Sequence, residues 1–239
     1  MKTSYYSLFF LLFILSGCAA TYLQAPKNMP LFETKGEVQI EAGVSTTSYF
    51  ATGSYAFSEK YALIANGSLS YGNFWDDIPD ALTIVTFGFA GSNVLPHHSV
   101  EMGLGRYNLL PSSKWKLETF LGAQYSMGNY HNDYDRCLQG FTQVNIGRRY
   151  NYIETGWSLS LAYSDFQLKT LSSNTQNIKY DNANAIIAEP LVFLKLGGKQ
   201  IQLFCRCGFC FLYILNSSVE ISSNFYFNAH CSTGLSFRF

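Results

Sequence analysis

Long stretches of this chain alternate between apolar residues and small or polar ones. This period of two is typical of β-strands, whose successive side chains point to opposite faces. From Ile153 to Tyr163 one face is mostly apolar, and the other consists of Glu, Gly, Ser and Ala. The stretches Trp115–Gly128 and Phe227–Phe239 repeat the pattern. The chain is therefore predicted to be all-β.

The residues on the second face of these strands distinguish a membrane barrel from a soluble sandwich. A soluble sandwich exposes charged side chains on its outer face, whereas here that face is small and polar, as suits the lumen of a narrow barrel. Charged residues make up only 13% of the chain, against about 25% in typical soluble proteins. Aromatic residues reach 17% and fit the girdles of a membrane barrel. We predict an antiparallel up-and-down transmembrane β-barrel; a soluble periplasmic β-barrel is the alternative.

Ten strands account for the alternation, and an even number suits a closed single-chain barrel. The connections expected to be long are 72–97, 129–138, 168–184 and 215–225, and all of them fall on one side of the barrel. Ala81–Gly91 also resembles a strand, so a twelve-stranded barrel is the alternative. The predicted strands are 36–45, 48–57, 60–71, 98–108, 115–128, 139–149, 151–167, 185–196, 199–214 and 226–239.

The N-terminus begins with one lysine and an apolar run from Leu8 to Leu15. This run is the length of a signal-peptide core and too short to span a bilayer. The sequence that follows, Leu-Ser-Gly-Cys ending at Cys18, resembles a bacterial lipobox. The resemblance implies cleavage before Cys18 and lipidation of its sulfur. The alternative is an ordinary signal peptide cleaved near Ala20. The expected organisation is a signal peptide at 1–17, a lipidated periplasmic tether at 18–35 and the barrel at 36–239.

The chain ends in GLSFRF, with alternating aromatics at Phe237 and Phe239. This ending resembles the signal by which outer-membrane barrels are recognised by the insertion machinery. With the lipobox, it makes the chain similar to small outer-membrane barrel lipoproteins of Bacteroidetes-type bacteria. That resemblance implies an outer-membrane location, contact with membrane lipid and no assigned catalytic residues. No acidic residue directly follows Cys18, which favours an anchor on the periplasmic side.

The predicted lumen face also gathers charged residues. Charges in a barrel lumen must be compensated, so we expect an ion-paired and hydrogen-bonded interior. Four phenylalanines at 50, 120, 141 and 204 would fill much of a ten-stranded lumen. A filled interior is therefore favoured over a narrow channel. The predicted charge network comprises Glu41, Glu101, Glu118, Glu154, Glu189, Arg206 and Arg238.

Three cysteines lie close together at positions 205, 207 and 210. On a strand, Cys210 points away from the other two, so the three cannot converge on one metal ion. We interpret them as small hydrophobic residues and expect no metal and no cofactor. If the preceding loop centres near residue 220, Cys207 lies opposite Cys231, and a cross-strand disulfide is the remaining alternative.

Enzymatic alternatives rest on residues near the barrel rim. Ten-stranded omptin-type proteases use Asp pairs and a His–Asp pair, and this chain offers Asp76, Asp77 and Asp80 in one loop and His131 and Asp133 in the next. Adjacent aspartates do not match the alternating spacing that such a site needs. A lipid A-modifying enzyme would need His, Ser and Glu together on the rim, which His97, His98 and His230 do not clearly supply.

The favoured function is therefore structural or loop-mediated binding, without catalysis. Loops on a rigid barrel are where recognition is expected, and 72–97 and 168–184 are the longest. Within the first loop, Phe74, Trp75, Asp76 and Asp77 combine an apolar pair with charges and form the candidate contact for an unknown extracellular ligand. The formal net charge is zero and no basic stripe occurs, so nucleic acid is excluded as a partner. We expect a monomer.

Overall fold

The computed structural model describes residues 26–70, 97–107, 110, 114–130, 133–171, 178–217 and 225–239. Ten antiparallel strands form one closed barrel, in which each strand pairs with its sequence neighbours and β1 pairs with β10. The strands are β1 Val38–Ser45, β2 Ser48–Tyr55, β3 Tyr61–Ser70, β4 His97–Arg106, β5 Trp115–Tyr130, β6 Asp133–Arg149, β7 Ile153–Leu171, β8 Ile178–Gly197, β9 Ile201–Ser217 and β10 Phe225–Arg238.

The prediction of an all-β ten-stranded barrel is confirmed. β3 pairs directly with β4, from Tyr61 opposite Arg106 to Leu69 opposite His98. The barrel therefore closes without a further strand between them, and the twelve-stranded alternative is wrong. Ala81–Gly91 lies outside the described residues. The seam closes where the backbones of Val38 and Phe239 exchange hydrogen bonds of 3.0 and 2.9 Å.

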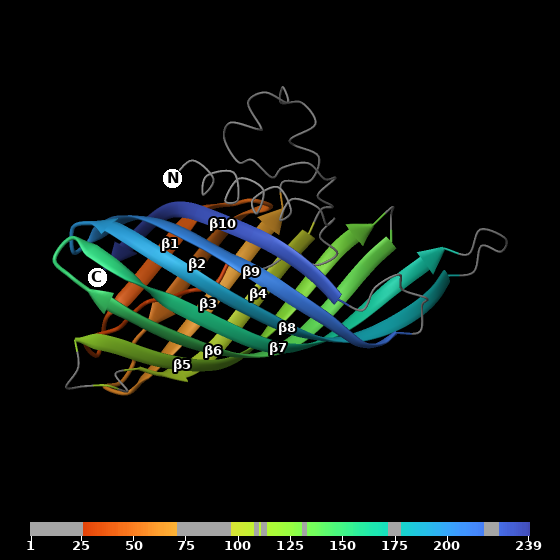
Figure 1. Ribbon diagram of the computed structural model, residues 1–239, viewed down its shortest axis with the longest axis horizontal. Coiled ribbons are helices and arrows are strands. Elements are labelled where there is room, and N and C mark those ends of the chain that lie inside the picture. Colours follow the sequence, from red (N-terminus) through yellow and green to blue (C-terminus); the bar gives the residue numbers. More distant parts are fainter. Residues whose placement is uncertain are drawn as a thin grey trace, which may run out of the picture.

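The wall of the barrel is much higher on one side than on the other. β1 and β2 contain 8 residues each, whereas β7 contains 19 and β8 contains 20. About 9–11 residues suffice for a tilted strand to cross a bilayer, so β7 and β8 continue well beyond that length. The hairpin that they form projects farthest from the barrel (Figure 1).

The two ends of the barrel differ. The turn end carries the connections 56–60, 107–114, 150–152 and 198–200, the start of β1 and the C-terminus. The extended end carries the other connections, at 46–47, 71–96, 131–132, 172–177 and 218–224. The predicted long loop at 129–138 is wrong, since β5 and β6 run through most of it. The prediction for 168–184 is wrong in the same way, since β7 and β8 occupy all but 172–177.

The alternation predicts which side chains face the lumen and which face outward. In β7 the apolar residues from Ile153 to Tyr163 are exposed on the outer surface, while Ser158, Ser160 and Ala162 are buried. Toward the extended end the outward residues of the same hairpin become polar, with Asp165, Gln167 and Asn182 exposed. In this hairpin the apolar outer surface thus gives way to polar residues before the strands end.

Candidate functional site

The lumen is filled by a segment that precedes the first strand. Pro26–Phe32, hereafter the plug segment, is buried at every position. We expected residues 18–35 to form a tether in the periplasm. The part of that tether from 26 to 32 lies instead inside the barrel. Lumen side chains from β5, β6, β8, β9 and β10 all contact it, so the plug segment is held from several sides at once.

Successive main-chain carbonyls of the plug segment accept hydrogen bonds from the barrel wall. Arg206 donates to the carbonyl of Lys27 at 2.9 Å, and Gln143 donates to that of Asn28 at 2.7 Å. Lys195 Nζ donates to the carbonyl of Met29 at 2.8 Å. The remaining bonds come from Arg238 to Pro30 at 2.9 Å, and from Arg149 to Leu31 at 2.5 Å. Five consecutive peptide carbonyls are therefore bound by side chains of the wall.

At the end of the plug segment a main-chain N–H group, and not a carbonyl, is bound by the wall. The backbone N–H of Phe32 donates to Glu118 Oε1 at 2.6 Å, and Asn145 donates to the other oxygen of Glu118 at 3.2 Å. Glu118 is fully buried, and both of its oxygens accept hydrogen bonds. The wall thus presents donors to plug carbonyls and an acceptor to a plug N–H, so it recognises the main chain of the plug segment.

The side chains of the plug segment add specific contacts. Lys27 Nζ lies 2.5 Å from Glu101 and 3.5 Å from Glu189, with all three side chains buried. The same ammonium lies 4.7 Å from the ring centroid of Phe141. At the other end the Phe32 ring packs on Tyr107, with 5.4 Å between their centroids. Met29 and Leu31 form an apolar cluster with residues of β8.

Glu41 is the centre of an ion cluster in the wall. Its carboxylate pairs with Lys195 at 2.8 Å and with Arg206. It also accepts hydrogen bonds from Gln39 at 2.5 Å and Thr52 at 3.3 Å. Glu41 is fully buried, and so are the two cations that it pairs with. Because both cations also donate to plug carbonyls, Glu41 orients two of the groups that hold the plug segment.

A second ion cluster lies near the turn end. Glu154 pairs with Arg238 and, at 2.9 Å, with Arg149. Glu37 pairs with the same two arginines at 2.8 and 3.0 Å. Both arginines also donate to plug carbonyls. This cluster therefore fastens the plug segment where it leaves the lumen toward β1.

All seven residues predicted for the lumen charge network are buried in the structure. Glu41 and Arg206 lie together, Glu154 and Arg238 lie together, and Glu101 and Glu189 meet through Lys27. Sequence reasoning missed Lys27, because it assigned that residue to the tether. The lumen face of the strands has more buried carboxylates than buried cations. This excess indicates that a further cation must come from outside the strands.

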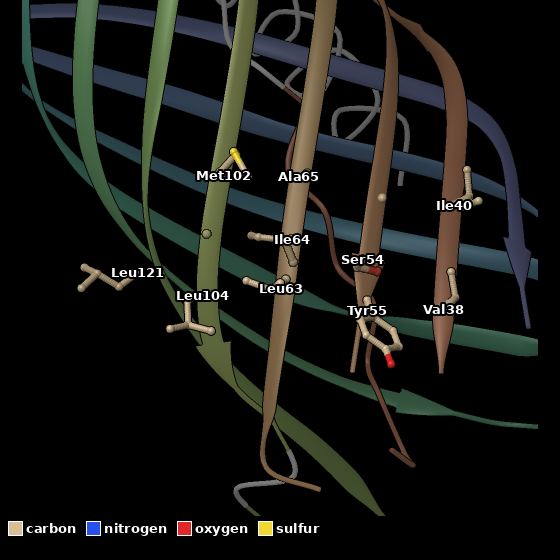
Figure 2. A pocket seen from close by; sticks show the side chains of 12 residues that line it. Val38, Ile40, Ser54, Tyr55, Leu63, Ile64, Ala65, Met102, Leu104 and Leu121 are labelled. Atoms are coloured by element: carbon tan, nitrogen blue, oxygen red, sulfur yellow. The ribbon is translucent and has the colours of Figure 1, made fainter. Parts of the chain in front are cut away.

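The outer surface carries a shallow apolar hollow across β1 to β5, with a volume of about 500 Å³. Figure 2 shows its lining, in which Ile40 stands on β1, Leu63 on β3 and Met102 on β4. The small outward residues Gly53 and Ala65 leave the space between them.

The cysteines follow the predicted faces of β9. Cys205 is exposed, Cys207 is partly exposed and Cys210 is buried, and none of the three forms a disulfide with another described cysteine. Cys207 and Cys231 are direct partners in the β9–β10 register, although no disulfide joins them. Within the described ranges, no group of three or more His, Cys, Asp or Glu side chains is placed to hold a metal ion.

Other predicted site residues have different outcomes. Phe237 lies in β10 opposite Ile201 and Ile40, and Phe239 is exposed at the turn end. Outside the described residues lie Cys18 and the loop candidates Phe74, Trp75, Asp76 and Asp77, together with Asp80 and His131.

The fold is that of outer-membrane β-barrel proteins. The structure is similar to the outer membrane protease OmpT from Escherichia coli, with a TM-score of 0.51 and 9% identity over 85% of this chain and 96% of that one. A second match is the N-terminal β-barrel domain of Pseudomonas aeruginosa OprF, with a TM-score of 0.35 and 11% identity over 87% of this chain and 100% of that one. No protein-family model and no curated protein sequence matches the chain. Among the described residues, no helix is long and apolar enough to cross a membrane.

Proposed function

We propose that this protein is a sealed outer-membrane barrel lipoprotein with a structural or binding role and no catalytic activity. The observation that carries the proposal is the plug segment, whose buried main chain occupies the lumen and is bound by the wall along its length. A segment bound in this way stands in the path that a narrow channel would need, which argues against the channel.

The outer surface supports the membrane location. Large apolar side chains are exposed on the outside of the described strands, for example Leu121 at 68% and Trp157 at 63%. Such a surface is costly in water and favourable in lipid. Short turns characterise the periplasmic end of these barrels and longer connections the outer end. We therefore assign the turn end to the periplasm. The proposed partners are membrane lipid and the barrel-insertion machinery. The protein is proposed to be a monomer.

The binding role is assigned to the extended end. The β7–β8 hairpin continues past the apolar band and exposes polar residues such as Asp165 and Asn182. A rigid hairpin standing outside the membrane presents a surface for an extracellular ligand at little cost in ordering. The loop candidates Phe74 to Asp77 belong to the connection between β3 and β4, which is at the same end.

The likeness to the protease OmpT concerns the fold alone, at 9% identity. The rim hydrolase, whether omptin-like or acting on lipid A, is therefore not the favoured function. A direct test is cleavage of a mixed peptide library by the purified protein with lipopolysaccharide. Peptide cleavage that is lost in His131→Ala would refute the non-catalytic role.

Conductance in planar bilayers tests the sealed lumen. The wild-type protein is expected to be silent, whereas Lys27→Glu, which places a third carboxylate beside Glu101 and Glu189, should open a conducting path by expelling the plug segment. Lys35→Glu is the matched control, because Lys35 is exposed and should leave the barrel silent. Heat-modifiability on a gel verifies that each variant has folded. Steady wild-type conductance, or a folded Lys27→Glu variant that stays silent, would refute the proposal.

A further inference from the structure

The plug segment has a direction, which its contacts define. Pro26 lines one small cavity together with Ser45, Thr46 and Thr47, which form the end of β1 and its connection to β2. That connection is at the extended end. Phe32, by contrast, packs on Tyr107, which directly follows the last residue of β4 at the turn end. The chain therefore enters the lumen at the extended end and descends to the turn end before β1 begins.

The order of the hydrogen bonds between these points agrees with that course. The Lys27 carbonyl is bound by Arg206, which is several residues into β9 from the turn end. The Leu31 carbonyl is bound by Arg149, the last residue of β6 at the turn end. The partners of the first and the fifth bound carbonyl thus agree with a course toward the turn end.

We infer that the barrel is threaded: the chain that precedes Pro26 leaves the lumen at the extended end and is displayed on the outer face of the membrane. This inference rests on the proposed membrane location, because that proposal assigns the extended end to the outside. The threaded course makes the lumen a binding site for a peptide main chain, and its resident ligand is the protein's own plug segment.

The inference changes where a lipid on Cys18 would be anchored. Pro26 comes eight positions after Cys18, a reach of at most about 29 Å. A return to the periplasm through the lumen is blocked by the plug segment. A return through lipid would leave backbone groups without hydrogen bonds in the hydrocarbon region. The lipid would therefore sit in the outer leaflet, and not in the periplasmic leaflet that the sequence around Cys18 favours.

Single added cysteines test this topology in intact cells with a membrane-impermeant maleimide. Thr21→Cys reports the segment before Pro26, Ser173→Cys reports the β7–β8 connection at the extended end, and Lys199→Cys reports an exposed position at the turn end. Wild-type protein gives the background from the native cysteines, and heat-modifiability on a gel verifies assembly. The threaded barrel predicts that Thr21→Cys and Ser173→Cys are labelled, and that labelling of Lys199→Cys is lost until the cells are permeabilised.

The other outcomes separate the two proposals. If Ser173→Cys is labelled and Thr21→Cys is protected together with Lys199→Cys, the membrane location stands and the threading is overturned. If Ser173→Cys and Lys199→Cys behave alike, the assignment of the two ends fails, and the threading to the outer face fails with it. Should Thr21→Cys impair assembly, the same labelling with Leu23→Cys decides between these outcomes.

Discussion

Replacing Glu41 with Gln should destabilise the barrel far more than its small change in shape suggests. The carboxylate is fully buried between Lys195 and Arg206, and its removal leaves two buried cations without a counter-ion. Breaking a buried ion pair by removing one partner costs about 3–5 kcal/mol. With a urea m-value of about 3 kcal/mol/M, the upper end for small proteins, the unfolding midpoint should fall by about 1 M or more.

The assay is urea unfolding in lipid vesicles, followed by tryptophan fluorescence and by the heat-modifiable band. Glu33→Gln is the matched control, because Glu33 pairs with Arg149 at 3.3 Å and with Lys116 at 3.6 Å while its side chain is 42% exposed. Exposed ion pairs contribute at most about 1 kcal/mol. The reasoning about buried charge is refuted if Glu41→Gln lowers the midpoint no more than Glu33→Gln does.

A double mutant separates lost charge from lost packing. Lys195→Met should destabilise the wild-type protein, because it leaves Glu41 with one cation fewer and leaves the Met29 carbonyl without its donor. In the Glu41→Gln background the same change should cost less, since it removes a cation that is already uncompensated. Equal costs in the two backgrounds would show that Glu41 and Lys195 do not interact energetically.

Three further predictions concern the wall and the seam. Gly122→Ala should reduce the heat-modifiable band, because an added Cβ would lie 2.2 Å from a backbone oxygen; Gly140→Ala, with nothing within 4 Å, should not. Mild oxidation should link Cys207 to Cys231, whose cross-strand positions place the Cβ atoms within reach of a disulfide; a mass unchanged by oxidation would contradict this. Deleting Phe239 removes two seam hydrogen bonds and should lower the free energy of unfolding by about 1–3 kcal/mol. Phe239→Ala keeps both hydrogen bonds and is the control. Equal unfolding midpoints for the two variants would refute the role of these backbone hydrogen bonds.

Much of the wall could be predicted from the sequence because the membrane enforces the alternation. Where a strand has lipid on one side and a packed lumen on the other, as in Ile153–Tyr163, every second residue must be apolar, and the strand is easy to recognise. Beyond the apolar band that constraint disappears. Residues 168–171 and 178–184 continue β7 and β8 with polar residues among the outward positions, so the sequence pattern resembles a loop.

The plug segment could not be predicted in this way. Its two prolines and its lack of a period of two indicate only an extended chain, which suits a tether as well as a buried segment. Its burial depends on partners far away in the sequence, such as Arg206 and Arg238, whose side chains supply the missing hydrogen bonds. Lys27 is informative only after Glu101 and Glu189 have been placed on the same lumen face.

The short connection between the plug segment and β1 determines how the plug competes with other ligands. Only residues 33–37 separate Phe32 from the first residue of β1. A short tether of this kind keeps a bound segment at an effective concentration on the order of millimolar. A free peptide with the same backbone would therefore have to exceed that concentration to displace it. The seam between β1 and β10 must also close around the plug segment. The plug segment therefore has to enter the lumen while the barrel assembles, and another peptide cannot readily replace it afterwards.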